Sequence, residues 1–141
     1  MIVCDTGPLV AAAIKDDARH RECVDLFTAL HLAGRPILVP GPVVAEVGYL
    51  LAREGGARVE AQFLTSLAER TLWPVELTSE DYRRSAELVL TYKDLPLGTT
   101  DATVIALCER LGLPEVATLD RRHFTVARPR HVDALTLLPD N

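Results

Sequence analysis

The stretch Leu95–Phe124, LPLGTTDATVIALCERLGLPEVATLDRRHF, decides the fold. The spacing of its apolar residues predicts a helix over residues 100–111, followed by a short buried strand at Val116–Leu119. Asp101 lies in the first turn of this helix, and Asp120 directly follows the strand. Both positions belong to the edge of an open α/β sheet where the strands end and where such sheets bind their ligands.

Short strands and helices alternate along the rest of the chain as well. Apolar runs bounded by turn residues predict further strands at Ile2–Cys4, Pro36–Val39, Leu72–Leu77 and Leu135–Leu138. Helical spacing predicts helices over residues 9–14, 19–33, 42–54, 57–69 and 79–91. This alternation predicts an α/β fold of three layers, with a mostly parallel central sheet flanked by helices.

Length and composition favour one domain with an aliphatic core. A chain of 141 residues can bury a sizeable core, so we expect a single domain over residues 1–141. Hydrophobic residues make up 48% of the chain and aromatic residues only 5%, which suits helices packed on a buried sheet.

The sequence shows no sign of export or membrane insertion. Its first residues carry no basic segment before the apolar run, and no apolar stretch reaches the roughly 18–20 residues of a membrane span. Three cysteines do not make a disulfide framework. We therefore expect a cytoplasmic protein with no membrane contact.

Two further acids, Asp5 and Glu46, are candidates to join Asp101 and Asp120. Asp5 directly follows the first strand, so IVCD and VATLD share the same order of strand and aspartate. Glu46 lies one turn into its helix among apolar neighbours, where the helix dipole favours negative charge. Each acid alone has a simpler interpretation, as a turn residue or as part of a solvated helix face.

The four acids are more informative together than singly. Carboxylates gathered at one sheet edge repel one another unless cations bind them. Oxygen ligands select Mg²⁺ or Mn²⁺, and a pair of such ions is a known arrangement for phosphodiester cleavage. The net charge of −5 argues mildly against a nucleic-acid binder, but this objection weakens if the acids are metal ligands.

Four short motifs carry a resemblance to a known family. They are IVCDTGPL at the start, VVAEV around Glu46, LPLGTTDATVIALCERLG around Asp101 and VATLDRRHF around Asp120. In these motifs and in its order of elements the chain resembles PIN-domain ribonucleases of the VapC toxin type. The resemblance implies a PIN-like fold and a Mg²⁺- or Mn²⁺-dependent endoribonuclease, with Asp5, Glu46, Asp101 and Asp120 as catalytic residues and metal ligands.

The resemblance also implies partners and supporting residues. The substrate is a tRNA or rRNA, whose cleavage inhibits translation. The protein partners are a second copy of the chain and a VapB-like antitoxin, which join in a heterotetramer or larger complex. Thr6 and Thr118 match polar positions beside the first and last aspartates, and Asp94 is either near the metal ligands or simply solvated. Many relatives carry a second aspartate where this chain has Arg121-Arg122-His123, so binding of one metal ion or two stays open.

The segment Arg121–His131 holds four arginines, two histidines and no acid. Because guanidinium donates two parallel hydrogen bonds to phosphate, four residues are candidates to bind the RNA backbone: Arg121, Arg122, Arg128 and Arg130. The alternative is a solvated tail or a partner surface. The histidines of the chain show no metal-ligand spacing, so the sequence assigns them no acid–base role.

Two other functions stay open. One is a PIN-like nuclease for RNA maturation or DNA flaps, and the other is a catalytically inactive binding module. The small size of the chain, with no further nucleic-acid domain, argues against the first. The intact set of four acids argues against the second.

Overall fold

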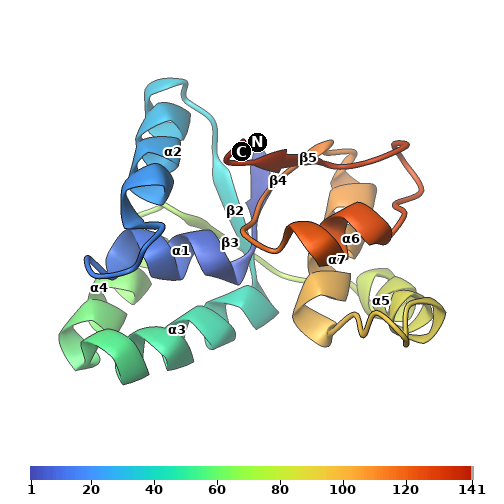
Figure 1. Ribbon diagram of the computed structural model, residues 1–141, viewed down its shortest axis with the longest axis horizontal. Helices are drawn as coiled ribbons and strands as arrows, with labels where there is room; N and C mark the ends of the chain where they lie inside the picture. Colours follow the sequence, from blue (N-terminus) through green and yellow to red (C-terminus); the bar gives the residue numbers. More distant parts are fainter. Residues whose placement is uncertain (141) are drawn as a thin grey trace.

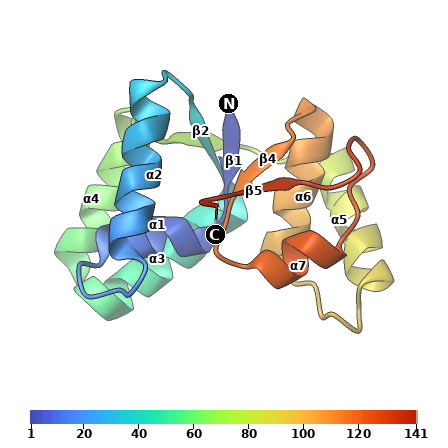
Figure 2. The ribbon, with the colours of Figure 1, turned by 45° about the horizontal axis from the view of Figure 1, so that its top comes forward.

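A parallel β-sheet separates two groups of helices in the computed structural model, which describes residues 1–140 (Figures 1 and 2). The strands are β1 (Ile2–Cys4), β2 (Ile37–Pro40), β3 (Trp73–Val75), β4 (Glu115–Ala117) and β5 (Thr136–Leu138). Their spatial order is β3-β2-β1-β4-β5, and every pairing in the sheet is parallel. The predicted α/β class, with a parallel sheet between helices, is confirmed.

The helices gather on the two sides of this sheet. On one side lie α1 (Thr6–Ala13), α2 (His20–Leu32), α3 (Gly41–Gly55) and α4 (Ala57–Ala68), as Figures 1 and 2 show. On the other side lie α5 (Ser79–Thr91), α6 (Thr99–Leu111) and α7 (Arg121–Val126). Within residues 1–140, no helix combines the length and the apolar character that a membrane crossing requires.

The order of the strands reverses at β1. The chain moves outward from β1 to β2 and β3, and then returns to the other side of β1 with β4 and β5. Val3 pairs with Val116 and Cys4 with Ala117, so the carboxyl ends of β1 and β4 lie side by side. Parallel sheets bind ligands at such a switch point, and Asp5 leaves the sheet here.

Helix α6 is held firmly in the core. Every residue from Ala102 to Cys108 is buried, including Val104 and Ile105 at 0% exposure. Full burial of an aliphatic side chain of this size contributes roughly 1.5–3 kcal/mol. The helix ends at Gly112, whose φ of +67° gives the left-handed C-cap that glycine adopts without strain. This packing fixes the position of Asp101 in the first turn.

Local sequence signals around α5 and β3 were correct. Thr78 and Asp81 form a capping box at the start of α5, in which each side chain accepts the backbone N–H of the other residue. Strand β3 lies at an edge of the sheet, where Pro74 is tolerated although proline lacks the N–H that a central strand needs.

The segment after β4 differs from the prediction. The strand stops at Ala117, not at Leu119, because the hydroxyl of Thr118 accepts the backbone N–H of Asp120 at 2.9 Å and bends the chain. Helix α7 then follows where a turn was expected. Asp120 caps it by accepting the backbone N–H of His123 at 3.1 Å, and Phe124 anchors it in the core with 1% exposure.

Candidate active site

The four predicted acids line one cavity of about 750 Å³ at the switch point of the sheet. Asp5 enters it from the end of β1, Glu46 from α3, Asp101 from α6 and Asp120 from the start of α7. Four separate segments of the chain therefore supply the carboxylates. Thr6, Gly7, Leu50, Leu119 and the Gly98–Thr100 segment complete the lining.

Asp5 is the most deeply buried of these acids, with 6% exposure. Burial, together with the neighbouring charges of Asp101 and Glu46, raises the pKa of Asp5 to about 6. Hydrogen bonds from the backbone of Thr6 and from the hydroxyl of Thr118 oppose this rise in pKa. A negative charge at Asp5 is therefore costly in the metal-free protein, and a cation in the cavity would relieve that cost.

Asp101 shares this environment at the first turn of α6. Burial raises the pKa of Asp101, and the charges of Asp120 and Glu46 add to the rise. A hydrogen bond with His123 lowers the same pKa. Glu46 is exposed at the same cavity, where it accepts a hydrogen bond of 2.9 Å from the hydroxyl of Thr100, the neighbour of Asp101 in the chain.

His123 is a site residue that the sequence analysis missed. Its Nδ1 lies 2.7 Å from Oδ2 of Asp101 and 2.9 Å from Oδ2 of Asp120. One donor atom from each of these three residues lies within 4.8 Å of the other two, a spacing that could hold a metal ion. The histidines show no metal-ligand spacing along the sequence, and the contact of His123 with Asp101 forms only in the fold. The available signal was Asp120-x-x-His123, which places both side chains on one face of a helical turn.

Thr6 and Thr118 lie beside Asp5, Thr6 as its neighbour in the chain and Thr118 through a hydrogen bond. The hydroxyl of Thr118 donates to Oδ2 of Asp5 at 2.9 Å. Thr6 is buried at 5% exposure, and its Oγ1 has no hydrogen-bond partner among residues 1–140. Gly7 allows a close approach of the two segments, because a Cβ at this position would lie 3.2 Å from Cβ of Leu119.

The remaining candidates lie apart from the four acids. Asp94 is exposed in the loop between α5 and α6 and does not belong to the described lining of the cavity, so solvation explains it best. Arg121 donates to the carbonyl of Pro139 at 3.4 Å, and Arg122 is exposed on α7. These two arginines directly follow Asp120.

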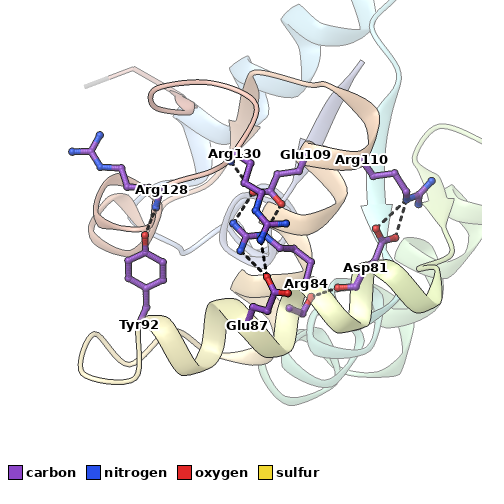
Figure 3. A network of polar contacts seen from close by, with 9 residues as sticks. Asp81, Arg84, Glu87, Tyr92, Glu109, Arg110, Arg128 and Arg130 are labelled. Atoms are coloured by element: carbon purple, nitrogen blue, oxygen red, sulfur yellow. Dashed lines mark hydrogen bonds and ion pairs between the residues drawn. The ribbon is translucent and has the colours of Figure 1, made fainter.

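Arg128 and Arg130 lie over α5 and α6 (Figure 3). The guanidinium of Arg130 is 2.8 Å from Glu87, and its backbone N–H donates to Glu109 at 2.8 Å. The backbone N–H of Arg128 donates to the hydroxyl of Tyr92 at 2.8 Å. The structure therefore divides the arginine segment, with one pair beside the acids and the other bound to two helices.

The donor set of the cavity fits a divalent cation. It offers several carboxylates that repel one another, an imidazole nitrogen between two of them, and the buried hydroxyl of Thr6 without a partner. Hard cations such as Mg²⁺ and Mn²⁺ take carboxylate and water oxygens. Asp5, Asp101 and Asp120 are the residues whose carboxylates would hold the ion, and the exposed Glu46 lines the same cavity.

Comparison with known proteins identifies the family. Residues 2–129 match the PIN domain family. The chain is 32% identical over 142 residues to Ribonuclease VapC26 of Mycobacterium tuberculosis, covering 98% of this chain and all of that protein.

Solved structures share the fold. Mycobacterium tuberculosis VapC20, described as a sarcin–ricin loop cleaving toxin, matches with a TM-score of 0.78 and 21% identity over 94% of this chain and 99% of its own. VapBC2 of Rickettsia felis, bound to a DNA fragment from its promoter, matches with a TM-score of 0.67 and 17% identity over 97% of each chain. These structures share the fold, and the two sequence matches show that the chain belongs to the PIN-domain family and, within it, to the VapC ribonucleases.

Proposed function

We propose that this protein is a Mg²⁺- or Mn²⁺-dependent endoribonuclease and the toxin of a type II toxin–antitoxin pair. One observation carries the proposal: four acids from four separate segments line a single cavity at the switch point of a parallel sheet. The membership in the VapC ribonucleases supports the reaction class.

The acids have different tasks in this proposal. Asp5, Asp101 and Asp120 hold the cation, and their fixed positions derive from β1, from the buried helix α6 and from the cap of α7. A bound divalent cation supplies an activated nucleophile at neutral pH and offsets charge on the scissile phosphate. Glu46 is exposed at the mouth, where its carboxylate can accept a proton or orient a water at the substrate.

Arg121 and Arg122 are the proposed contacts to the RNA backbone. They stand at the start of α7, next to Asp120, so a phosphate bound by them lies close to the cavity. The side chain of Arg130 forms an ion pair with Glu87. The backbone N–H of Arg128 donates to the hydroxyl of Tyr92, which holds this segment against the end of α5. We therefore assign the latter two arginines to positioning of the C-terminal segment.

The proposed substrate is a structured tRNA or rRNA loop, cleavage of which inhibits translation. The description of the similar VapC20 as a sarcin–ricin loop cleaving toxin supports this class of substrate. The likeness to VapBC2 supports a VapB-like antitoxin as partner. We further propose a homodimer of the toxin and a heterotetramer or larger complex with the antitoxin.

RNA cleavage by the purified protein tests the function. Total tRNA and ribosomal RNA are incubated with the protein in Mg²⁺, in Mn²⁺ or in EDTA. We expect discrete cleavage products with either cation, none in EDTA, and at least a hundredfold loss of rate in Asp5→Asn and Asp101→Asn. The exposed Asp16→Asn is the matched control and should cleave like the wild type. Cleavage that persists in EDTA or in both site variants would contradict the proposal.

A further inference from the structure

We propose that Nδ1 of His123 is a direct ligand of the cation, beside Asp101 and Asp120, and that it makes the site prefer Mn²⁺ over Mg²⁺. The inference rests on the proposed function, because it assumes a divalent cation in the cavity. It replaces an all-oxygen site by one with a mixed nitrogen and oxygen donor set.

The first support is the convergence of three donors on one point. Nδ1 of His123 is 2.7 Å from an oxygen of Asp101 and 2.9 Å from an oxygen of Asp120. These atoms come from two helices, and each lies within 4.8 Å of the others. An ion placed among them would be bound by two carboxylates and one imidazole.

The second support is that the imidazole is held in place. Asp120 accepts the backbone N–H of His123 at 3.1 Å, which fixes the first turn of α7. The next residue, Phe124, is 1% exposed in the core. The imidazole itself is 21% exposed, so it is largely shielded from bulk solvent, and its Nδ1 lies against the carboxylates of Asp101 and Asp120. Little conformational entropy remains to be lost when such a side chain binds a ligand.

The third support comes from a different part of the cavity wall. The hydroxyl of Thr6 is buried, and it has no hydrogen-bond partner among residues 1–140 although the residue lines the same cavity. An unpaired buried polar group costs about 1–3 kcal/mol. Beside the clustered carboxylates, this hydroxyl is a further polar group of the cavity wall that the protein itself leaves without a partner.

The choice of metal follows from the donor set. Mg²⁺ is bound through oxygen and keeps several waters, whereas imidazole is a ligand of transition metals. Mn²⁺ shares the carboxylate preference of Mg²⁺ and, as a transition ion, also accepts a nitrogen ligand. An aspartate in place of His123 would give an all-oxygen set, so this one residue would decide the preference.

Pulsed electron paramagnetic resonance of bound Mn²⁺ tests the inference directly, because a coordinated ¹⁴N modulates the electron spin echo. We expect this modulation in the wild type and in His31→Asn, a control at an exposed histidine that does not belong to the donor group of Asp101, Asp120 and His123. It should vanish in His123→Asn and His123→Asp. Wild-type protein labelled with ¹⁵N-histidine should change its modulation from ¹⁴N to ¹⁵N, and this measurement does not depend on how well any variant folds.

Calorimetric titration of Mn²⁺ and Mg²⁺ gives the second readout. We expect the ratio of the Mg²⁺ to the Mn²⁺ dissociation constant to fall at least about tenfold in His123→Asp. Mn²⁺ that binds the wild type without nitrogen modulation, or an unchanged ratio in a folded His123→Asp, would overturn the inference and leave the proposed nuclease intact. Failure of the wild type to bind either cation would instead contradict the proposed function and, with it, the inference.

Discussion

The hydroxyl of Thr118 donates a hydrogen bond of 2.9 Å to Oδ2 of Asp5, across a sequence separation of 113 residues. The same hydroxyl oxygen accepts the backbone N–H of Asp120 at 2.9 Å. One buried side chain therefore joins the ends of β1 and β4 and sets the position of two of the proposed metal ligands. The pairing of β1 with β4 brings Thr118 next to Asp5.

Replacing Thr118 by valine should therefore weaken the site through its geometry. The variant loses both hydrogen bonds while it keeps the shape of the side chain, and we expect the free energy of unfolding to fall by about 1–3 kcal/mol. Cation affinity should fall about 10–100-fold, as for other residues that orient a metal ligand. Denaturant unfolding and calorimetric titration measure the two effects. Thr118→Ser keeps the hydroxyl and should recover most of the affinity; equal loss in both variants would contradict this role.

Asp5 should make the metal-free protein less stable as pH rises through about 6. Its folded-state pKa of about 6 exceeds the ordinary value of 3.8, so the folded protein binds the proton more tightly than the unfolded chain does. The resulting stability is complete below the unfolded pKa and is lost as pH rises through the folded pKa. At about 1.4 kcal/mol per pKa unit, the loss reaches up to about 3 kcal/mol.

The variant Asp5→Asn isolates this contribution. In EDTA, its free energy of unfolding relative to the wild type should rise between pH 4 and pH 7.5, by up to about 3 kcal/mol. Denaturant unfolding at a series of pH values provides the measurement, with the exposed Asp16→Asn as control. A difference that stays constant or falls over this pH range would show that burial does not govern Asp5.

The ion pair of Arg84 with Glu109 should contribute to stability (Figure 3). Two contacts of 2.8 and 3.0 Å join these side chains, which are 17% and 11% exposed. Burial alone would raise the pKa of Glu109, but hydrogen bonds from Arg84 and from the backbone of Arg130 lower it below its ordinary value. Arg84→Met leaves this carboxylate largely buried without its main partner, and we expect a loss of about 2–3 kcal/mol.

The neighbouring Arg83 provides a matched control. Its side chain is 69% exposed and pairs with an equally exposed Glu80, so Arg83→Met should change the free energy of unfolding very little. The effect of Arg84→Met should shrink as pH falls through the lowered pKa of Glu109, because the wild type then loses the contribution of the pair. Equal effects of the two variants at neutral pH would contradict this prediction.

RNA affinity should depend more on Arg121 and Arg122 than on Arg128 and Arg130. The measurement uses an Asp101→Asn background, so that the RNA stays uncut. Each lost phosphate contact should make the negative slope of log association constant against log salt concentration less steep by about 0.7. Fluorescence anisotropy over a series of salt concentrations measures this slope for Arg121→Gln and Arg122→Gln. Arg128→Gln and Arg130→Gln serve as controls, and an equal change in all four slopes would argue against the division of this segment.

Features set by neighbouring residues could be predicted from the sequence. The predicted helices over residues 79–91 and 100–111 agree with α5 and α6, because the cap at Thr78 and the end at Gly112 each depend on one helical turn. Asp5 and Asp120 could be placed at one edge because the carboxyl ends of parallel strands share an edge. Asp101 followed from its place in a helix whose apolar residues mark a buried face.

Features set by distant contacts could not be predicted. His123 meets Asp101 across 22 residues, and this contact depends on the short helix α7, which has too few residues to show an apolar period. Arg130 lies in a sequence segment without acids, yet it forms an ion pair with Glu87 of helix α5. The ion pair of Arg130 with Glu87 could not be predicted from the charges along the sequence, because this partner comes from tertiary packing.

Binding of a cation by the acids of the cavity can be measured most directly by calorimetric titration of Mn²⁺ into metal-free protein. The wild type and the exposed Asp16→Asn should bind with equal affinity, and Asp101→Asn should bind at least about tenfold more weakly because it loses a charged ligand. Mn²⁺ should raise the midpoint temperature of thermal unfolding equally for the wild type and Asp16→Asn, and less for Asp101→Asn. Equal binding by Asp101→Asn and the wild type would contradict a cation site in this cavity.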